Sequence, residues 1–260
     1  MSKVQPKKKL GQHFLRDMGV AERIASAVTG NGYNSVLEIG PGTGILTGLL
    51  LKRNFADFRV VEIDHESVNY LHEHFPDLKG ILTGDFLEMD LDRYFSGKIA
   101  IIGNFPYNIS TQILFKVLKY REKVAELTGM LQKEVAERIC SGPGTKVYGI
   151  LSVLLQAYYK TEYLFTVSEH VFVPPPRVKS GVIRLTRNGV KHLDCDESLF
   201  FRVVKACFNQ RRKTLKNSVR AAFEMKNWDY ADLGLRPEQL SVDQFVRLTK
   251  WIEANRVLSE

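Results

Sequence analysis

A short segment near the middle of the chain carries residue types that could hold a flat ring with polar edges. Asn104–Tyr107 (Asn-Phe-Pro-Tyr) follows an apolar run at 98–102 that is typical of a buried parallel strand, and it precedes residues 111–119, which are apolar at helical spacing. Asn offers a hydrogen-bond donor and an acceptor, and Tyr offers a π-face. Because ligands of open α/β sheets bind beyond the carboxyl ends of the strands, the segment predicts a ring-binding site there. An ordinary strand-to-helix turn is the alternative.

A glycine-rich turn follows the strand predicted at 35–39. Its pattern is Glu38-x-Gly40-x-Gly42-x-Gly44, and glycines there let the backbone approach a ligand before a helix begins. The dinucleotide fingerprint G-x-G-x-x-G would need its third glycine at position 45, which is Ile45, so a nicotinamide or flavin site is not indicated. The spacing instead resembles motif I of class I S-adenosylmethionine (SAM) methyltransferases. A purely structural glycine turn is the alternative.

Acidic residues end the next two predicted strands. Glu62 ends the strand at 58–63, where a carboxylate can accept hydrogen bonds from both ribose hydroxyls; Asp64 is a rival candidate. Asp85 follows the short strand at 80–83 and is placed to accept a hydrogen bond from an adenine amino group, or else to cap the following turn. Three strand ends that each carry a suitable polar group predict a site for the SAM nucleoside.

Strand and helix patterns alternate through most of the chain. Strands are predicted at 35–39, 58–63, 80–83, 98–102 and 126–132, with two later strands at 161–168 and 180–186 that could pair antiparallel. Helices are predicted after Asp17, through position 51, and at 65–75, 111–119, 133–139, 148–159, 199–208, 214–223 and 242–254. The pattern predicts a doubly wound α/β domain over residues 1–187, beginning with a basic arm at 1–16, and a helical domain over residues 188–260.

The charge balance indicates a polyanionic partner. The chain has 37 Lys+Arg against 29 Asp+Glu, a net charge of +8. Two clusters stand out, Lys7-Lys8-Lys9 and Arg211-Arg212-Lys213, and this clustering favours nucleic acid over a membrane surface as the partner. A solubilising surface charge is the alternative.

Other features exclude whole classes of protein. No apolar run approaches the roughly 18–20 residues of a membrane span, and no apolar stretch follows the basic N-terminus as in a secretory signal. Cys140, Cys195 and Cys207 show no disulfide or metal spacing, and the six histidines form no H-E-x-x-H motif. We expect a reduced, cytoplasmic protein that has no metal site and makes no membrane contact.

The Asn-Phe-Pro-Tyr segment beside a SAM-type turn resembles the N6-adenine methyltransferases. More narrowly, seven segments in order along the chain resemble the KsgA-type small-subunit rRNA adenine dimethyltransferases. They are Lys9–Leu15 (KLGQHFL), Val36–Gly44 (VLEIGPGTG), Gly84-Asp85, Asn104–Ser110 (NFPYNIS), Gln132–Arg138 (QKEVAER), Val171–Ser180 (VFVPPPRVKS) and Phe208–Leu215 (FNQRRKTL). Together they cover almost the full length, which makes the resemblance highly specific.

The resemblance implies a Rossmann-like class I SAM-dependent methyltransferase fold with a seven-stranded, mostly parallel sheet and a small all-α C-terminal domain. It implies SAM-dependent dimethylation at N6 of two adjacent adenosines. These would lie in a hairpin loop near the 3′ end of small-subunit (16S) rRNA, within the assembling small ribosomal subunit. We expect a monomer in which Lys7, Lys8, Lys9, Arg211, Arg212 and Lys213 bind RNA phosphate.

The resemblance also implies roles for single residues. The cofactor-binding positions are His13, Leu15, Gly40, Gly42, Glu62, Asp85 and Asn104. The catalytic positions are Asn104, Pro106, Tyr107 and Phe172. The Asn104 side-chain oxygen and the Phe105 or Pro106 carbonyl would accept the amino protons of the target adenine. Tyr107 would stack on one face of the base and Phe172 on the other, although Phe172 could instead be a core aromatic. His13 replaces the commoner Asn and Phe105 the commoner Leu.

Three other functions share these motifs. The Erm-type large-subunit rRNA dimethyltransferases have the same catalytic segment, but residues 172–180 and 208–215 fit the KsgA type better. A non-catalytic assembly or transcription factor on this fold would show an eroded SAM site, whereas this one is intact. A DNA adenine methyltransferase is the third alternative.

Overall fold

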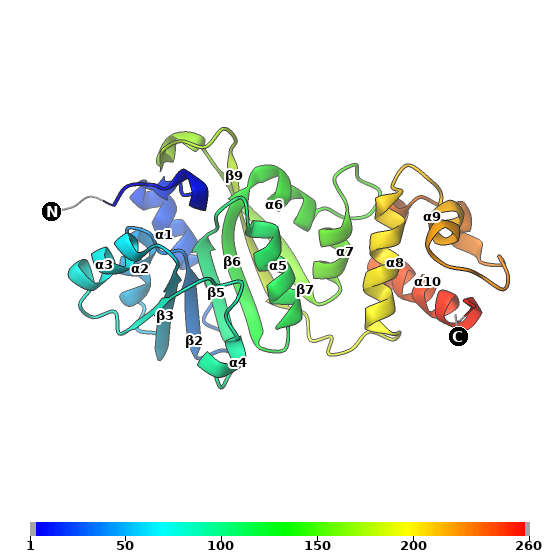
Figure 1. Cartoon of the computed structure of the whole chain (residues 1–260), viewed down its shortest axis with the longest axis horizontal. Coiled ribbons are helices and arrows are strands. Elements are labelled where there is room, and N and C mark those ends of the chain that lie inside the picture. The colour runs from blue at the N-terminus through cyan, green and yellow to red at the C-terminus, as the bar shows by residue number, and fades with distance from the viewer. Residues whose placement is uncertain (1–3, 258–260) are drawn as a thin grey trace. The chain divides into compact units, whose positions relative to one another are not determined.

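A computed structural model describes residues 4–257 of the chain, which form two compact units (Figure 1). The first contains the chain up to Ala136 together with Thr161–Arg187. The second contains Glu137–Lys160 and the chain from Asn188 onward. The boundary predicted after residue 187 therefore coincides with one of the observed divisions. The second unit also takes in Glu137–Lys160, because α7 (Ile150–Gln156) packs against α8 (Glu197–Asn209). The functions expected of the two domains stay predictions.

The first unit is built on a seven-stranded sheet in the order β4-β3-β2-β5-β6-β9-β7. The strands are β2 (Ser35–Ile39), β3 (Asp57–Glu62), β4 (Gly80–Thr83), β5 (Ile99–Asn104), β6 (Val124–Gln132), β7 (Tyr159–Val167) and β9 (Ser180–Arg187). Strands β2 to β6 run parallel, and β9 is antiparallel to β6. The predicted strands are confirmed, with bounds that move by at most two residues.

The strand order reverses between β2 and β5. From β2 the chain proceeds outward through β3 to β4, and it then returns to the other side of β2 to form β5 and β6. Every residue of β5 before Asn104 is buried, as expected of a central parallel strand that is covered on both faces. Such a switch point opens a crevice at the carboxyl ends of the strands, so ligands are expected beyond Ile39 and Asn104.

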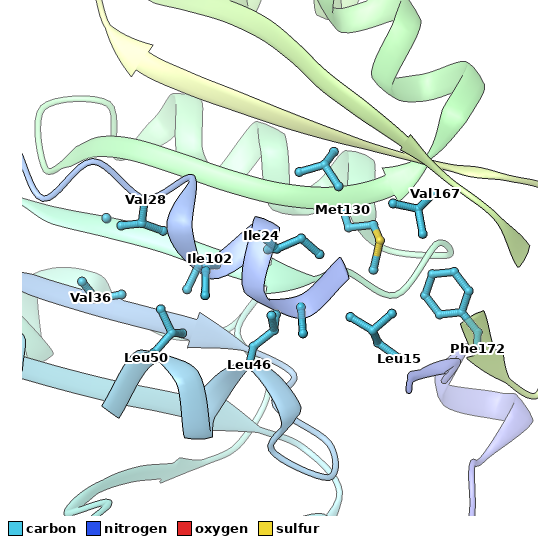
Figure 2. Close-up of a cluster of buried hydrophobic side chains, with 14 of the residues drawn as sticks. Leu15, Ile24, Val28, Val36, Leu46, Leu50, Ile102, Met130, Val167 and Phe172 are labelled. Atoms are coloured by element: carbon cyan, nitrogen blue, oxygen red, sulfur yellow. The ribbon is translucent and has the colours of Figure 1, made fainter. Parts of the chain in front are cut away.

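The helices of the first unit join these strands. They are α1 (Met18–Ser26), α2 (Ile45–Leu51), α3 (His65–His74), α4 (Leu91–Tyr94), α5 (Ser110–Lys119) and the start of α6 (Lys133–Cys140). Asp17 caps α1 as predicted, since its side chain accepts a hydrogen bond from the Val20 N–H. Ile24 of α1 and Leu46 and Leu50 of α2 are buried in one hydrophobic cluster with residues of the sheet (Figure 2).

The N-terminal arm holds structure that the sequence does not indicate. Lys8–Leu10 forms a turn of 3-10 helix, η1, and Phe14–Leu15 forms a short strand, β1. Strand β1 pairs antiparallel with β8 (Phe172–Val173), which follows the 3-10 turn η2 (Glu169–Val171). Two-residue strands are too short to show a periodic pattern, so only the fold reveals the pairing.

The second unit is helical. Besides α7 and α8 it contains α9 (Leu215–Ala222), α10 (Val242–Asn255) and the 3-10 turns η3 (Ala231–Gly234) and η4 (Pro237–Gln239). The helix predicted at 148–159 is shorter, because the chain turns after Gln156 and Tyr159 begins β7. Tyr148 and Phe208 pack edge to face, with ring centroids 6.1 Å apart. No helix within residues 4–257 is both long and apolar enough to cross a membrane.

Candidate cofactor and active site

A cavity lies at the carboxyl ends of the central strands. The arm, the glycine turn after β2 and the ends of β3, β4 and β5 all contribute to its lining. Eight of the predicted cofactor-binding and catalytic residues line it together: His13, Gly40, Gly42, Glu62, Asp85, Asn104, Pro106 and Tyr107. The parallel register explains this convergence, because it brings the ends of neighbouring strands to one edge of the sheet.

The glycine turn exposes backbone to the cavity. Gly40 and Gly42 have φ of +65° and +56°, a region that favours glycine. The Gly40 N–H donates to the Val61 carbonyl at 2.9 Å, and no other atom would lie within 4 Å of a Cβ at position 40. A Cβ at position 42 would lie 2.8 Å from the Phe14 ring. The turn is therefore open at Gly40 and covered by the arm at Gly42.

Glu62 lies deep in the wall and is held by backbone. Its Oε2 accepts from the Gly42 N–H at 3.1 Å and its Oε1 accepts from the Asp64 N–H at 2.9 Å. Burial raises the pKa of Glu62, and these two N–H groups partly oppose that rise. Each oxygen keeps capacity for one more hydrogen bond, so the carboxylate can accept one hydrogen bond from each of two ribose hydroxyls.

Asp64 is engaged elsewhere. It is not among the residues that line the cavity, and its side chain accepts from the Glu66 N–H and the Ser67 hydroxyl at the start of α3. Of the two acids considered from the sequence, Glu62 is therefore the one that faces the cavity.

Asp85 caps the following turn and also lines the cavity, and its contact with an adenine amino group stays a prediction. Its Oδ1 accepts from the Leu87 N–H at 2.8 Å, which closes the turn after β4, and the residue also lines the cavity. Sequence reasoning misses the residue that fixes this loop, Lys116 of α5. Its Nζ donates to the carbonyls of Phe86 (2.6 Å), Leu87 (3.0 Å) and Met89. The sequence feature that could have indicated this role is the position of Lys116 on the apolar face of the predicted helix.

Asn104 ends β5 with its amide orientation determined by the arm. Its Nδ2 donates to the His13 carbonyl at 2.9 Å, so its Oδ1 is left as an acceptor. The Pro106 carbonyl accepts from the Ile109 N–H at 3.2 Å, which favours the Phe105 carbonyl as the second acceptor for an amino group. The Phe105 ring is buried and occupies space left by Gly129, where a Cβ would lie 2.2 Å from it.

Tyr107 is tied to β9, the strand that runs antiparallel to β6. Its hydroxyl shares a 2.6 Å hydrogen bond with Ser180, the first residue of β9. Burial raises the pKa of Tyr107, so the hydroxyl is protonated at neutral pH. The centroids of the His13 and Tyr107 rings lie 5.7 Å apart. His13 Nδ1 donates to the Pro174 carbonyl at 2.7 Å. Sequence reasoning gives Ser180 no role.

Two predicted site residues lie in the hydrophobic core instead of the cavity. Leu15 and Phe172 are only 4% and 2% exposed, and they pair across β1 and β8. Figure 2 shows both side chains in the cluster that contains Ile24, Met130 and Val167. The structure thus corrects the expected placement of Phe172 against a target base and gives it the core position considered as its alternative. Leu15 borders two other hollows, one beside Gly40 and Asn104 and one beside Met18 and Leu49.

The basic clusters divide into engaged and exposed residues. Lys7 forms ion pairs with Asp64 and Glu66, and Arg211 donates to the carbonyls of Thr145 and Lys146. The remaining members, Lys8, Lys9, Arg212 and Lys213, are exposed, and Lys9 also lines the cavity. The structure therefore gives Lys7 and Arg211 partners within the protein.

The described part of the chain contains no group of three or more His, Cys, Asp or Glu side chains arranged to hold a metal ion. Cys195 and Cys207 are free thiols. The groups that line the cavity include carboxylates, amides, aromatic rings and glycine backbone.

Comparison with known proteins relates the chain to one family. The family described as ribosomal RNA adenine dimethylase matches residues 3–254. Ribosomal RNA small subunit methyltransferase A of Parabacteroides distasonis is 58% identical over 252 residues, which cover 96% of this chain and 94% of the relative. The protein of the same name from Flavobacterium johnsoniae is 54% identical over 262 residues and the full length of both chains.

Solved structures share the fold. A dimethyladenosine transferase from Plasmodium falciparum superposes with a TM-score of 0.78 at 23% identity, covering 95% of this chain and all of that one. The 23S rRNA methyltransferase ErmE superposes with a TM-score of 0.66 at 24% identity, covering 92% of this chain and 99% of that one. At these identities the likeness concerns the fold, and it confirms the predicted Rossmann-like methyltransferase architecture.

Proposed function

The chain belongs to the ribosomal RNA adenine dimethylase family, and on that premise we propose that it dimethylates N6 of two adjacent adenosines in small-subunit rRNA. The target lies in a hairpin loop near the 3′ end of that rRNA, within the assembling small subunit in the bacterial cytoplasm, and the enzyme acts as a monomer. The observation that carries the proposal is the convergence of the nucleoside-type acceptors Glu62 and Asp85 with Asn104–Tyr107 on one cavity.

The cavity fits S-adenosylmethionine, the methyl donor of this chemistry. Glu62 would accept a hydrogen bond from each ribose hydroxyl, and Asp85 would accept one from the adenine amino group. The open backbone at Gly40 would lie against the amino-acid portion of the cofactor. Ile63 lines the same cavity and is 47% exposed, which offers an apolar face to the adenine ring. The donor supplies a sulfonium methyl that is already activated for transfer.

The protein's task is then to prepare the nucleophile. The lone pair of an adenine amino group is delocalised into the ring, which makes it a weak nucleophile. Asn104 Oδ1 and the Phe105 carbonyl would accept hydrogen bonds from the two N–H groups of this amino group. These bonds would favour a pyramidal nitrogen. Two fixed acceptors act by positioning and electrostatics, so no strong base is needed.

Tyr107 would hold the target base by stacking on it. Its ring is fixed in orientation through the Ser180 hydroxyl, so it forms a prepared platform at the cavity. The base must leave its own stack to reach this ring, which favours an adenosine in a loop over one in a duplex.

RNA phosphate is bound mainly by the exposed cations. We expect Lys8 and Lys9 on the first unit and Arg212 and Lys213 on the second to supply this contact. Lys7 and Arg211 would contribute less, because their charged groups already bond within the protein.

A substrate comparison tests the proposal. Labelled SAM is supplied with undermethylated small-subunit particles, large-subunit particles or adenine-containing DNA, and N6,N6-dimethyladenosine is measured. We expect the product in the small-subunit particles alone. Label in the large subunit would support the Erm-type alternative, and label in none of the three substrates would contradict the proposed activity.

A further inference from the structure

The N-terminal arm forms a wall of the cofactor cavity. Residues Lys9–Phe14 all line the cavity, opposite the strand ends that carry Glu62 and Asp85. The C-terminal end of this wall is secured by β1–β8 pairing and by the hydrogen bond from Asn104 to the His13 carbonyl. At its N-terminal end Val4 is buried, but η1 itself is a single turn without a buried residue, so a further attachment there adds to the hold on the wall.

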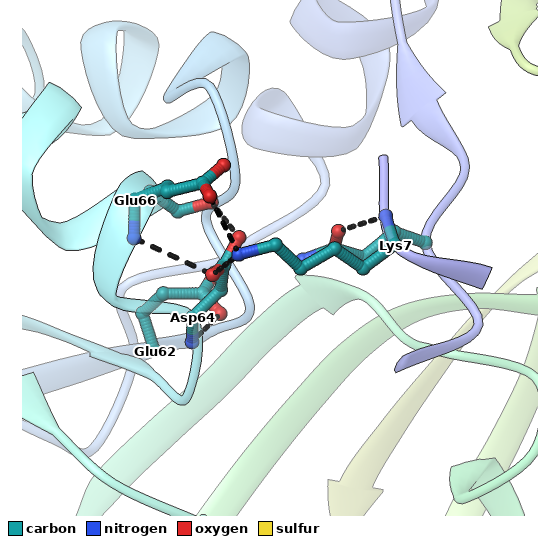
Figure 3. A network of polar contacts seen from close by, with 6 residues as sticks. Lys7, Glu62, Asp64 and Glu66 are labelled. Atoms are coloured by element: carbon teal, nitrogen blue, oxygen red, sulfur yellow. Dashed lines mark hydrogen bonds and ion pairs between the residues drawn. The ribbon is translucent and has the colours of Figure 1, made fainter. Parts of the chain in front are cut away.

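Lys7 supplies that attachment (Figure 3). Its Nζ donates to Asp64 and lies 3.2 Å from Glu66 Oε1, and its backbone N–H donates to Gln12 Oε1 at 2.8 Å. The Lys7 side chain is 28% exposed, whereas that of Asp64 is only 2% exposed. A carboxylate so enclosed depends on its cation, because an unpaired charge at such a site is strongly unfavourable.

The ion pair is bonded directly to the predicted ribose acceptor. The Asp64 N–H donates to Glu62 Oε1 at 2.9 Å, so Lys7, Asp64 and Glu62 form one connected chain of polar contacts. Burial pulls the pKa of Asp64 upward, but the hydrogen bonds from Lys7 and from the Glu66 N–H outweigh it and lower that pKa. The pair therefore remains ionised at neutral pH.

We propose that Lys7 is a positioning residue that latches the arm over bound SAM and keeps the Glu62 carboxylate in place through Asp64. This inference rests on the proposed function, because it takes the cavity to be the SAM site. It assigns Lys7 to cofactor retention, whereas its position in a basic cluster indicates RNA binding. Since the pair is partly exposed, salt weakens the latch.

The test measures S-adenosylhomocysteine binding by calorimetry in the absence of RNA. Lys7→Met should bind roughly tenfold more weakly, the size expected from the loss of one charge-assisted hydrogen bond. Lys7→Arg keeps the charge and should restore most of the affinity. Lys8→Met is the matched control, since Lys8 lies in the same turn and outside the cavity lining, and it should bind as the wild type does.

Salt dependence and hydrogen exchange separate a latch from general damage. Raising the salt concentration should weaken wild-type binding more than Lys7→Met binding, and amides of residues 8–14 should exchange faster in the ligand-bound Lys7→Met protein. Wild-type affinity in Lys7→Met, or failure of Lys7→Arg to restore binding, would overturn the latch. If the wild type itself bound no S-adenosylhomocysteine, the assignment of the cavity would fail instead.

Discussion

Two walls of the same cavity are built by different physical means. The strand-end wall carries Gly40, Glu62, Asp85 and Asn104, and each position follows from the hydrogen-bonded register of a buried parallel sheet. The arm wall at 9–14 is held by a two-residue strand, a few side-chain bonds and the Lys7 ion pair. Sheet register is cooperative, whereas arm contacts are individually weak. Chemistry and the direct contacts to the cofactor should therefore depend on the first wall, and the cover that the arm places over the bound cofactor should depend on the second.

The largest effect should come from the strand-end wall at Asn104. Asn104→Ala removes the Oδ1 acceptor and should slow methyl transfer by roughly 10²–10³, the usual cost of losing one preorganised polar contact. The measurement is single-turnover transfer from labelled SAM to undermethylated small-subunit particles.

Asn104 also bonds to the arm, which requires a control. His13→Ala keeps the backbone carbonyl that Asn104 Nδ2 contacts, so the amide orientation should survive. Circular dichroism confirms folding of both variants. Transfer by Asn104→Ala at the wild-type rate would refute the catalytic role of the amide.

Glu62 should show the next largest effect. Glu62→Ala loses contacts to a charged acceptor and should weaken SAM binding by about 1.5–3 kcal/mol in calorimetric titration. Asp64→Asn is the matched variant, because Asn can still cap α3 and keeps the backbone N–H to Glu62. Asp64→Asn should cost less than Glu62→Ala; the reverse order would assign the ribose contact to Asp64.

The pH dependence of binding checks the same residue. Burial raises the pKa of Glu62, so the carboxyl takes up its proton at a higher pH than an exposed Glu does. A protonated carboxyl is a poorer acceptor, and SAM affinity should therefore fall as the pH falls through that raised pKa. Glu62→Gln should remove this dependence.

Tyr107 tests how far its hydrogen bond to β9 positions the base. Tyr107→Ala should lose base stacking, on the order of 1–3 kcal/mol in RNA binding or transfer rate. Tyr107→Phe keeps the π-face and loses only the bond to Ser180, so its cost should be about 0.5–1.5 kcal/mol.

Ser180→Ala provides the matched test, because it removes the same hydrogen bond from the other side. Ser180→Ala and Tyr107→Phe should have equal effects, and the double variant should be no worse than either. An effect of Tyr107→Phe as large as that of Tyr107→Ala would mean that the hydroxyl, not the ring, carries the function.

The smallest effect on chemistry should come from the exposed cations. Charge removal at Arg212 and Lys213 should weaken RNA binding and reduce the salt slope by about 0.7 for each phosphate contact to a single strand. SAM affinity should not change. Arg211→Ala is a useful comparison, because this side chain bonds to the 145–146 carbonyls and should change the salt slope less. An unchanged slope in the Arg212, Lys213 double variant would place the RNA footprint elsewhere.

Most of the strand-end wall follows from local sequence. A buried parallel strand reads as a short apolar run, glycines mark the turn after β2, and an acid directly after a strand must lie at its carboxyl edge. These features are periodic or adjacent along the chain, so the sequence by itself determined the strands, most of the helices and the convergence of Gly40, Asp85 and Asn104, whereas the choice of Glu62 over Asp64 needed the structure.

Only the tertiary structure decided how the remaining residues are used. Lys7 stands in a run of three lysines, yet its side chain binds Asp64, which lies 57 positions away, and so attaches the arm to the start of α3. Phe172 precedes a proline run, yet pairing with Leu15 turns it into the core. Ser180 holds Tyr107 through a contact between residues far apart in the sequence. Lys116 holds the Asp85 loop in the same way. Such contacts depend on which surfaces meet after folding, and no pattern along the sequence records them.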